Sequence, residues 1–144
     1  MKLFKLLITT VLFVLSSATA FSADEYIVKM SPENVEGAKT ISNSEAKALF
    51  DNGALFVDVR SKKAYAKGRI PDALFLDLKS GFTKEALLEE AALTDPVIIY
   101  CQGVKCKRAS IGAEKALKWG FKEVYYYRLG YPGWKDEGYP VEAD

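Results

Sequence analysis

Short apolar runs alternate along the chain with longer segments whose apolar residues recur at helical spacing. The runs at 55–60 and 97–100 are mostly apolar, which is typical of strands buried on both faces of a parallel sheet. Ser42 and Glu45 have the spacing of a capping box, so a helix is expected to begin there and to end before Gly53. The pattern therefore predicts strands and helices in alternation.

The same signals place elements along the rest of the chain. Strands are expected at 39–41, 55–60, 73–76, 97–100 and 124–127. Helices are expected at 42–52, 61–67, 80–93, 109–119 and 134–137, the last after a loop at 129–133. This order predicts an α/β fold with a mainly parallel sheet and helices on both faces. Ligands of such sheets bind beyond the C-terminal ends of the strands, and Cys101 follows one of those ends.

The N-terminus differs in character from the rest of the chain. Residues 1–20 have a positive start, a short apolar stretch and a small-x-small ending at Ala20, which is typical of a cleaved secretory signal. An uncleaved N-terminal anchor is the alternative. Residues 21–38 are expected to form an arm with little regular structure, and residues 39–144 to form the folded domain. We expect a periplasmic or secreted protein, without stable membrane insertion once the signal is removed.

Charge and composition exclude several classes of function. The chain has 20 basic and 19 acidic residues, and removal of Lys2 and Lys5 with the signal leaves 18 basic residues and a net charge of −1. Such a balance gives no general reason to bind nucleic acid. The chain has no histidine, which excludes Ser-His-Asp and Cys-His catalysis, and two cysteines cannot fill a zinc site. We expect neither a metal nor a cofactor.

Residues 97–110 carry the clearest chemical signal. An apolar strand runs into Cys101, and Lys105, Lys107 and Arg108 follow before a predicted helix. Cations and a helix N-terminus lower the pKa of a thiol and favour a bound oxyanion, so Cys101 is a candidate thiolate nucleophile. The alternative is an inert, buried structural cysteine. Cys106 could close a disulfide with Cys101, and so short a loop suggests a redox or regulatory role for that bridge rather than a structural one.

Four stretches, taken in chain order, carry a family pattern. They are residues 58–60 with 65–73, residues 99–101, residues 108–110, and residues 130–134 with 138–141. Together they resemble the signatures of the rhodanese-like family over about residues 39–142. The resemblance implies the three-layer rhodanese-like fold.

The resemblance also implies a sulfurtransferase in which Cys101 is the nucleophile. Cys101 would take a sulfane sulfur from thiosulfate or a similar donor, become a persulfide, and pass the sulfur to a thiophilic acceptor. The donor would be a small sulfur-containing anion or a persulfide, and a protein thiol is one candidate acceptor. The loop that binds substrate would comprise Gln102, Gly103, Val104, Lys105, Cys106, Lys107 and Arg108.

Four further residues are expected to support that loop. Asp58 and Arg60 are expected to form a structural pair near it rather than a general acid and base. Ser110, at the expected helix start, is expected to cap the helix and to donate to the loop. Trp134 is expected to pack as a lid on the loop or on the core.

The chain departs from the family pattern in its loop and in one turn. Six residues separate Cys101 from Arg108, where simpler members have four, and related phosphatases also have a longer loop. A thiol-based arsenate reductase or phosphatase is therefore an alternative, and a non-catalytic binding module or sulfur carrier is another. Arg69 and Asp72 replace a histidine and a glycine, changes expected to be structural. Cys106 resembles the second cysteine of a Cys-x-Gly-x-x-Cys subgroup often found in exported proteins, where it could resolve the persulfide or be a bystander.

Overall fold

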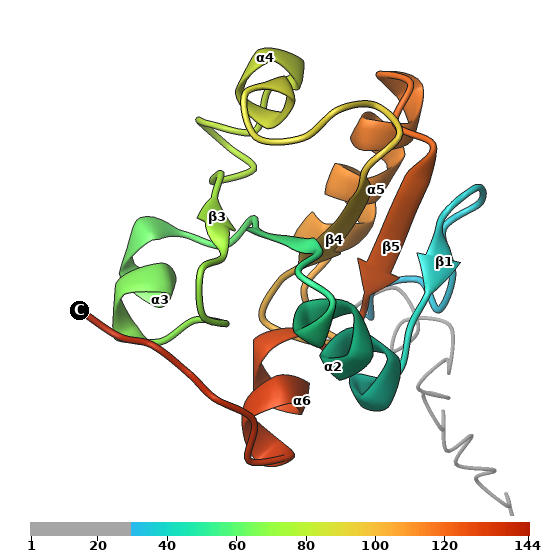
Figure 1. Cartoon of the computed structure of the whole chain (residues 1–144). Helices are drawn as coiled ribbons and strands as arrows, with labels where there is room; N and C mark the ends of the chain where they lie inside the picture. Colours follow the sequence, from blue (N-terminus) through green and yellow to red (C-terminus); the bar gives the residue numbers. More distant parts are fainter. Residues whose placement is uncertain (1–29) are drawn as a thin grey trace, which may run out of the picture.

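A parallel five-stranded sheet forms the centre of the molecule (Figure 1). The computed structural model describes residues 30–144, so the expected signal sequence and residues 21–29 of the expected arm lie outside the described residues. The strand order is β1-β5-β4-β2-β3, which places β4 between β2 and β5 in the middle of the sheet. The strands are β1 (Lys39–Thr40), β2 (Leu55–Asp58), β3 (Leu74–Phe75), β4 (Pro96–Tyr100) and β5 (Glu123–Tyr127).

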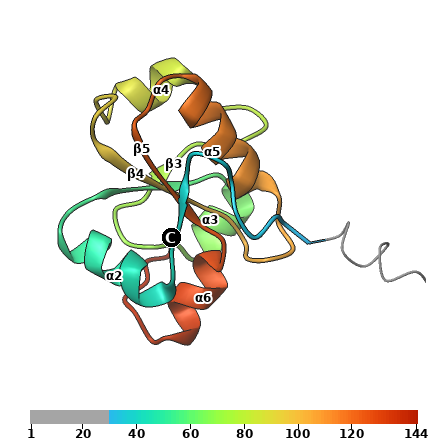
Figure 2. The ribbon, with the colours of Figure 1, turned by 90° about the vertical axis from the view of Figure 1, so that its right-hand side faces the viewer.

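Helices cover both faces of this sheet. They are α2 (Asn43–Asp51), α3 (Lys62–Lys67), α4 (Lys84–Leu88), α5 (Arg108–Lys118) and α6 (Gly130–Asp136). Figure 2 shows α4 and α5 on one side of the sheet and α2 and α6 on the other. The predicted α/β class with helices on both faces is therefore confirmed. Among residues 30–144, no helix has the length and apolar character that a membrane crossing requires.

The alternation of side chains along β4 divides the core in two. Val97, Ile99 and Cys101 belong to the apolar cluster beneath α4 and α5, which also contains Ala113. Ile98 and Tyr100 belong to the cluster on the other face, with Trp134 of α6. Residues 97–101 are at most 1% exposed, so the strand that leads to the cysteine is fixed by packing on both sides.

The capping box predicted at the start of α2 is present. The Ser42 N–H donates to the Glu45 carboxylate at 2.9 Å, and the Glu45 N–H donates to the Ser42 hydroxyl at 3.2 Å. The two bonds satisfy donors that the first turn of a helix leaves unpaired. The sequence signal and the local structure therefore agree at this position.

The helix predicted over 80–93 is wrong in extent, because α4 spans only Lys84–Leu88. The carbonyl of Asp77 accepts three successive backbone N–H groups and forms a turn in place of a helix start. The helix begins only after Thr83, whose hydroxyl accepts an N–H as the N-cap. Beyond the helix, the Asp95 carboxylate accepts the Ala92 N–H at 2.8 Å. The turn at Asp77 and the Thr83 cap therefore delay the start of the helix, and the turn that Asp95 closes on Ala92 lies beyond its end.

The loop predicted at 129–133 is also wrong, since α6 begins at Gly130 rather than at Trp134. Pro132 falls in the first helical turn, where a backbone N–H has no partner within the helix, so its missing donor costs little. Glycine and proline therefore mark the start of this helix instead of preventing it.

The residues that depart from the family pattern near the first signature make structural contacts, as predicted. The Arg69 guanidinium lies 2.9 Å from Asp144 and 3.6 Å from Glu142, and its backbone bridges to Glu142. Asp72 occupies the turn with a φ of 58°, the one positive φ among non-glycine residues at 30–144. Aspartate tolerates this region better than most side chains, which explains how it can stand at a position suited to glycine.

Candidate active site

Cys101 lies at the C-terminal end of β4, in the middle of the sheet. Its carbonyl accepts the backbone N–H of Tyr131 at 3.0 Å, which ties the end of β4 to the start of α6. Gly130 has a φ of 59°, and a Cβ there would collide with the Cys101 carbonyl. The close approach of α6 to the cysteine therefore depends on glycine at this position.

The loop after Cys101 folds back on itself and joins its two cysteines in a disulfide. The Cα atoms of Cys101 and Cys106 lie 6.3 Å apart, within the range that a disulfide spans. The Cys106 N–H donates to the Gly103 carbonyl at 2.9 Å, and Gly103 has a φ of 109°. This tight turn carries the Cys106 sulfur back to Cys101. In this form the Cys106 N–H is paired within the loop, so it is not available to bind a ligand.

Ser31 anchors the outer side of this loop. Its backbone N–H and its hydroxyl both donate to the Val104 carbonyl, each at 2.8 Å. Val35, four residues on, is buried in the core. The segment at 30–38, which has no helix or strand, therefore packs on the domain and helps to fix the loop.

Asp58 and Arg60 form a buried ion pair beside the loop, as the sequence predicted. The closest oxygen and nitrogen of the two groups lie 2.6 Å apart, and the side chains are 0% and 3% exposed. Arg60 also donates to the Gly68 carbonyl at 2.7 Å and to the Gln102 amide oxygen at 3.0 Å. Its guanidinium lies 4.6 Å from the ring centroid of Tyr131. The arginine therefore connects the end of β2 with the cysteine loop and with α6.

Arg60 remains a cation in this environment. Burial lowers its pKa, but the hydrogen bonds and the charge of Asp58 outweigh burial and raise the pKa above its ordinary value. The pKa of the neighbouring Tyr100 is also raised, chiefly by burial and then by the charge of Asp58, so this phenol stays neutral. Its oxygen accepts the Ile70 N–H at 3.2 Å. The Arg60 guanidinium is therefore charged, and the Asp58 carboxylate balances its charge within the pair.

Arg108 brings a second guanidinium to the site from the first turn of α5. Its Nη1 donates to the Val59 carbonyl at 3.1 Å and to the Asp77 carboxylate at 3.0 Å. The Arg108 side chain is 23% exposed, so these two bonds fix its buried part while the rest faces solvent. A guanidinium has five donors, and these two bonds leave others for a ligand.

These groups surround one cavity of about 230 Å³. Its lining consists of Arg60, Ser61, Ala64, Gln102, Cys106 and Arg108. Two guanidinium groups and a sulfur atom at one small opening form a site suited to an oxyanion beside a thiol. Cys101 itself is 1% exposed, so Cys106 presents the accessible sulfur of the pair in this disulfide form.

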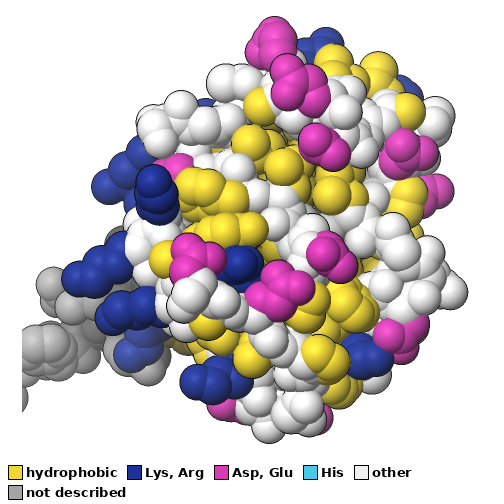
Figure 3. All heavy atoms as spheres, turned by 60° about the vertical axis from the view of Figure 1, so that its left-hand side comes forward, with side chains coloured by type: hydrophobic (Ala, Val, Ile, Leu, Met, Phe, Trp, Pro, Cys, Tyr) yellow, Lys and Arg dark blue, Asp and Glu magenta, His cyan; other side chains and the backbone are white. Residues whose placement is uncertain are grey.

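The predicted loop residues do not all reach this cavity. Lys105 and Lys107 are exposed and do not line it, and Gly103, Val104 and Lys105 line a second hollow of about 350 Å³ near Pro132. On the face in Figure 3, Lys and Arg side chains gather along the left side of the molecule. The two arginines line the cavity, whereas the lysines of the loop lie outside its lining.

One predicted supporting role is corrected. Ser110 does not cap α5, because Lys107 is the N-cap and makes no side-chain capping bond. The Ser110 hydroxyl donates to the Lys107 carbonyl at 2.8 Å, so the predicted donation to the loop is confirmed. Trp134 was expected to pack on the loop or on the core, and it packs in the core. It is fully buried against Phe50, Phe56 and Tyr139, with its indole N–H on the Pro140 carbonyl at 2.7 Å.

Sequence reasoning did not single out three residues that the fold brings to the site. Ser61, the N-cap of α3, and Ala64, in its first turn, line the cavity, and Tyr131 lies against Arg60. Ser61 had a usable signal, since it was expected to begin a helix directly after Arg60, and its hydroxyl does accept the Ala64 N–H at 3.3 Å. Within residues 30–144, no cluster of three His, Cys, Asp or Glu side chains is placed to hold a metal ion.

Comparison with known proteins identifies the family of this fold and site. The model of the rhodanese-like domain matches residues 42–137. The chain is 32% identical to the thiosulfate sulfurtransferase GlpE of Pseudomonas syringae pv. syringae over 105 residues, which cover 73% of this chain and 93% of that protein. It is 33% identical to GlpE of Actinobacillus pleuropneumoniae over 105 residues, 72% of this chain and 92% of that one. The chain belongs to the rhodanese-like family, and it is an enzyme of the rhodanese type.

Solved structures show the same architecture. The thiosulfate sulfurtransferase of Pseudomonas aeruginosa superposes with a TM-score of 0.62 at 26% identity, over 74% of this chain and 20% of that larger one. The BH2092 protein of Bacillus halodurans gives a TM-score of 0.65 at 24% identity, over 83% of this chain and 82% of that chain. The second likeness concerns the fold alone.

Proposed function

We propose that this enzyme transfers a sulfane sulfur through a persulfide on Cys101, from thiosulfate or a similar donor to a thiophilic acceptor. One observation carries the proposal. Cys101 ends the central strand, and the cavity beside its disulfide partner is lined by two arginines. The relatives named thiosulfate sulfurtransferase support this choice of donor.

The first half of the reaction forms the persulfide. The Cys101 thiolate attacks the outer sulfur of thiosulfate, an S–S bond forms to Cys101, and the S–S bond of the donor breaks to release sulfite. Arg108 is suited to bind the sulfonate oxygens and the departing sulfite, because it lines the cavity, is partly exposed and has donors left over. Arg60 lines the same cavity, but most of its donors are held by Asp58, Gly68 and Gln102. The second half returns the thiolate when an acceptor, such as cyanide or a thiol, removes the outer sulfur.

Reduction of the loop must come before this chemistry. The structure joins Cys101 to Cys106, and a disulfide sulfur cannot act as the thiolate nucleophile. The enzyme is therefore expected to be silent toward thiosulfate until a reductant opens the bridge. The pair has the Cys-x-Gly-x-x-Cys spacing, and its sensitivity to reductant would make it redox-active.

The leader at 1–20 suggests where the enzyme works. We propose that it is exported to a periplasmic or extracellular space, where a protein thiol is a candidate acceptor besides small thiols. N-terminal sequencing of protein from the fractionated natural host would test this. A mature protein that begins at Phe21, found outside the cytoplasm, supports the proposal, and an intact leader in the cytoplasmic fraction would overturn it.

The decisive assay is thiocyanate formation from thiosulfate and cyanide by reduced protein lacking the leader. Reduced wild type should turn over with ping-pong kinetics, and Cys101→Ser should lose turnover by about 10³-fold or more, because it lacks the nucleophile. Cys106→Ser should retain turnover and should no longer require reductant.

Absence of turnover in reduced wild type would reject thiosulfate as the donor. Polysulfide, arsenate and a phosphate ester would then be tested with the same three proteins. Turnover with arsenate or the ester alone would favour the oxyanion enzyme. Uptake of sulfur without transfer to any acceptor would favour a sulfur carrier.

A further inference from the structure

We propose that Cys106 is a second catalytic residue, which attacks the persulfidated Cys101 and releases the transferred sulfur as sulfide. The inference rests on the proposed persulfide at Cys101 and adds a product that simple transfer to an acceptor does not give. It assigns the enzyme a reductive branch, in which the disulfide seen in the structure is the end state of one catalytic cycle.

The first ground is the position of the two sulfur atoms. The fold places Cys106 in bonding contact with Cys101 while the strand, the loop turn and the helix all keep regular hydrogen bonds. The turn from Gly103 to Cys106 needs the positive φ of Gly103, and the Val104 carbonyl between them is fixed by Ser31. The six residues between Cys101 and Arg108 are thus arranged to return a thiol to the nucleophile. A thiol so placed meets a persulfide on Cys101 at high effective concentration.

The second ground is the difference in exposure between the cysteines. Cys101 is 1% exposed, whereas Cys106 is partly exposed and lines the cavity with Arg60 and Arg108. Cys106 therefore reaches the Cys101 sulfur from within the loop, on the side that faces the cavity, and no external thiol has to enter for this attack.

The step balances without any further reactant. The Cys106 thiolate attacks the Cys101 sulfur, the Cys101–Cys106 bond forms, and the bond to the outer sulfur breaks. The outer sulfur leaves with the electron pair, takes one proton from solvent and departs as hydrosulfide. Two thiolates are oxidised to one disulfide while one sulfane sulfur is reduced to sulfide, a two-electron exchange.

A dithiol reductant, free or carried by a protein, resets the enzyme. Its thiolate would attack Cys106, the accessible sulfur, and Cys101 would leave as the thiolate. The direction of attack follows access and leaving-group stability, since a thiolate held near cations departs more readily. The nucleophile for the next thiosulfate is then regenerated directly.

The test is a single turnover of reduced wild type with excess thiosulfate and no added reductant or acceptor. Sulfite, sulfide and remaining protein thiols are measured over time. We expect about one equivalent each of sulfite and sulfide per protein, with loss of both thiols, because one disulfide forms per sulfur reduced. Addition of dithiothreitol should restart sulfide release at a steady rate.

Cys106→Ser is the informative variant and Cys101→Ser its matched control. Cys106→Ser should still release sulfite, release less than about a tenth of the wild-type sulfide, and hold one extra sulfur atom on Cys101 by intact-protein mass. Cys101→Ser should release neither product. Cys106→Ala serves as a second variant, with circular dichroism as the check that each protein is folded.

The outcomes separate the two proposals. No sulfite from reduced, folded wild type means that the persulfide does not form, and the proposed function itself fails. Sulfite without sulfide, with a stable persulfide and a free Cys106 thiol in wild type, overturns the role of Cys106 and leaves the proposed function intact. Equal sulfide release from wild type and Cys106→Ser would overturn it as well.

Discussion

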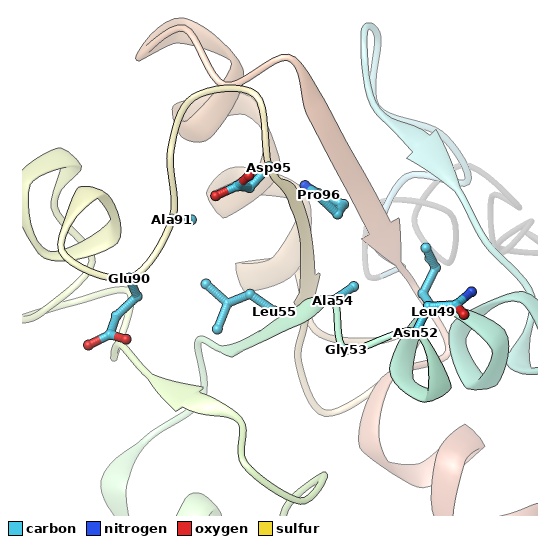
Figure 4. A pocket seen from close by; sticks show the side chains of 9 residues that line it. All are labelled: Leu49, Asn52, Gly53, Ala54, Leu55, Glu90, Ala91, Asp95 and Pro96. Atoms are coloured by element: carbon cyan, nitrogen blue, oxygen red, sulfur yellow. The ribbon is translucent and has the colours of Figure 1, made fainter.

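Both ends of the central sheet carry a cavity, but within the described part of the chain only the cavity at the C-terminal end is lined by a cysteine and by arginines. The cavity at the N-terminal ends of β2 and β4 measures about 340 Å³, larger than the 230 Å³ beside the cysteine loop (Figure 4). Its side chains include Leu49 and Leu55 with the carboxylates of Glu90 and Asp95, and of the described residues that line it none is Lys, Arg or Cys. The C-terminal cavity instead presents Arg60, Arg108 and a cysteine sulfur.

This difference shows that charge and position in the fold define the site better than size does. The two carboxylates of the N-terminal cavity have no cation among the described residues of its lining, which disfavours an anionic donor there. The C-terminal cavity presents guanidinium donors, although Asp58 and Asp77 pair with those groups from behind. Parallel strands also end in loops that can project side chains toward one point, and here β2 supplies Arg60 while β4 supplies Cys101.

The largest effect is expected from splitting the buried ion pair at the C-terminal end. Arg60→Met leaves the Asp58 carboxylate buried without its partner, and such a change costs about 3–5 kcal/mol. The measurement is the free energy of unfolding by urea. In the double variant Asp58→Asn with Arg60→Met the loss should be smaller than the sum of the single losses. Additive losses would show that the two side chains do not act as a pair.

A change at Arg108 should act on substrate rather than on folding. Arg108→Met removes a cavity cation, and kcat/KM for thiosulfate should fall about 10- to 100-fold, because a hydrogen bond to a charged group is worth about 1.5–3 kcal/mol. Arg108→Lys should recover part of the loss, since it keeps the charge but not the forked donors. Unchanged steady-state kinetics in the folded Arg108→Met variant would remove this arginine from the binding site.

The capping box of α2 lies at the same end of the sheet as the cysteine loop, but its residues do not line the cavity there. A change in it should therefore affect stability alone. Ser42→Ala should lower the free energy of unfolding by about 1 kcal/mol and leave turnover unchanged. The pKa of Glu45 is lowered, first by the Ser42 N–H and then by Lys39. Its stabilising effect is therefore present above the ordinary carboxyl pKa and is lost as pH falls through the lowered value.

Unfolding curves of wild type and Glu45→Gln at several pH values check this sign. The difference in stability between them should be present at neutral pH and should shrink toward strongly acidic pH. A difference that grows on acidification would contradict the capping interaction.

The smallest effect is expected at the N-terminal cavity, which serves as the control for the other end. Glu90→Lys changes the charge of this cavity, yet thiocyanate formation should stay within about twofold of wild type, because screening weakens the influence of a distant exposed charge. Steady-state kinetics at low and moderate salt would check this. A large gain or loss of turnover would show that the cavity at the N-terminal ends of the strands takes part in the reaction, which would contradict this account.

Much of this fold could be predicted from the sequence because its signals are local. The apolar run before Cys101 and the Ser42–Glu45 spacing each contain the information that fixes their element. The extent of α4 and the start of α6 could not be predicted in the same way. Both depend on which backbone groups find a partner, as with the turn at Asp77 and the close contact of Gly130 with Cys101.

The candidate site was predictable in its residue types but not in its arrangement. The spacing of Cys101, Lys105, Lys107 and Arg108 predicted a cationic loop. It could not show that Arg108 lines the cavity while the two lysines lie outside its lining. Arg108 takes its place because its guanidinium donates to the Val59 carbonyl and to the Asp77 carboxylate, which belong to distant parts of the sequence. Likewise, Tyr131 reaches the site only because α6 docks on the end of β4.

The most direct test of the central claim follows one sulfur atom. Reduced Cys106→Ser protein is incubated with thiosulfate labelled in its outer sulfur, without acceptor, and then digested for mass analysis. The label should be found on the peptide that contains Cys101, and cyanide should release it as thiocyanate. Thiocyanate that forms while Cys101 never carries the label would contradict transfer through a persulfide at this residue.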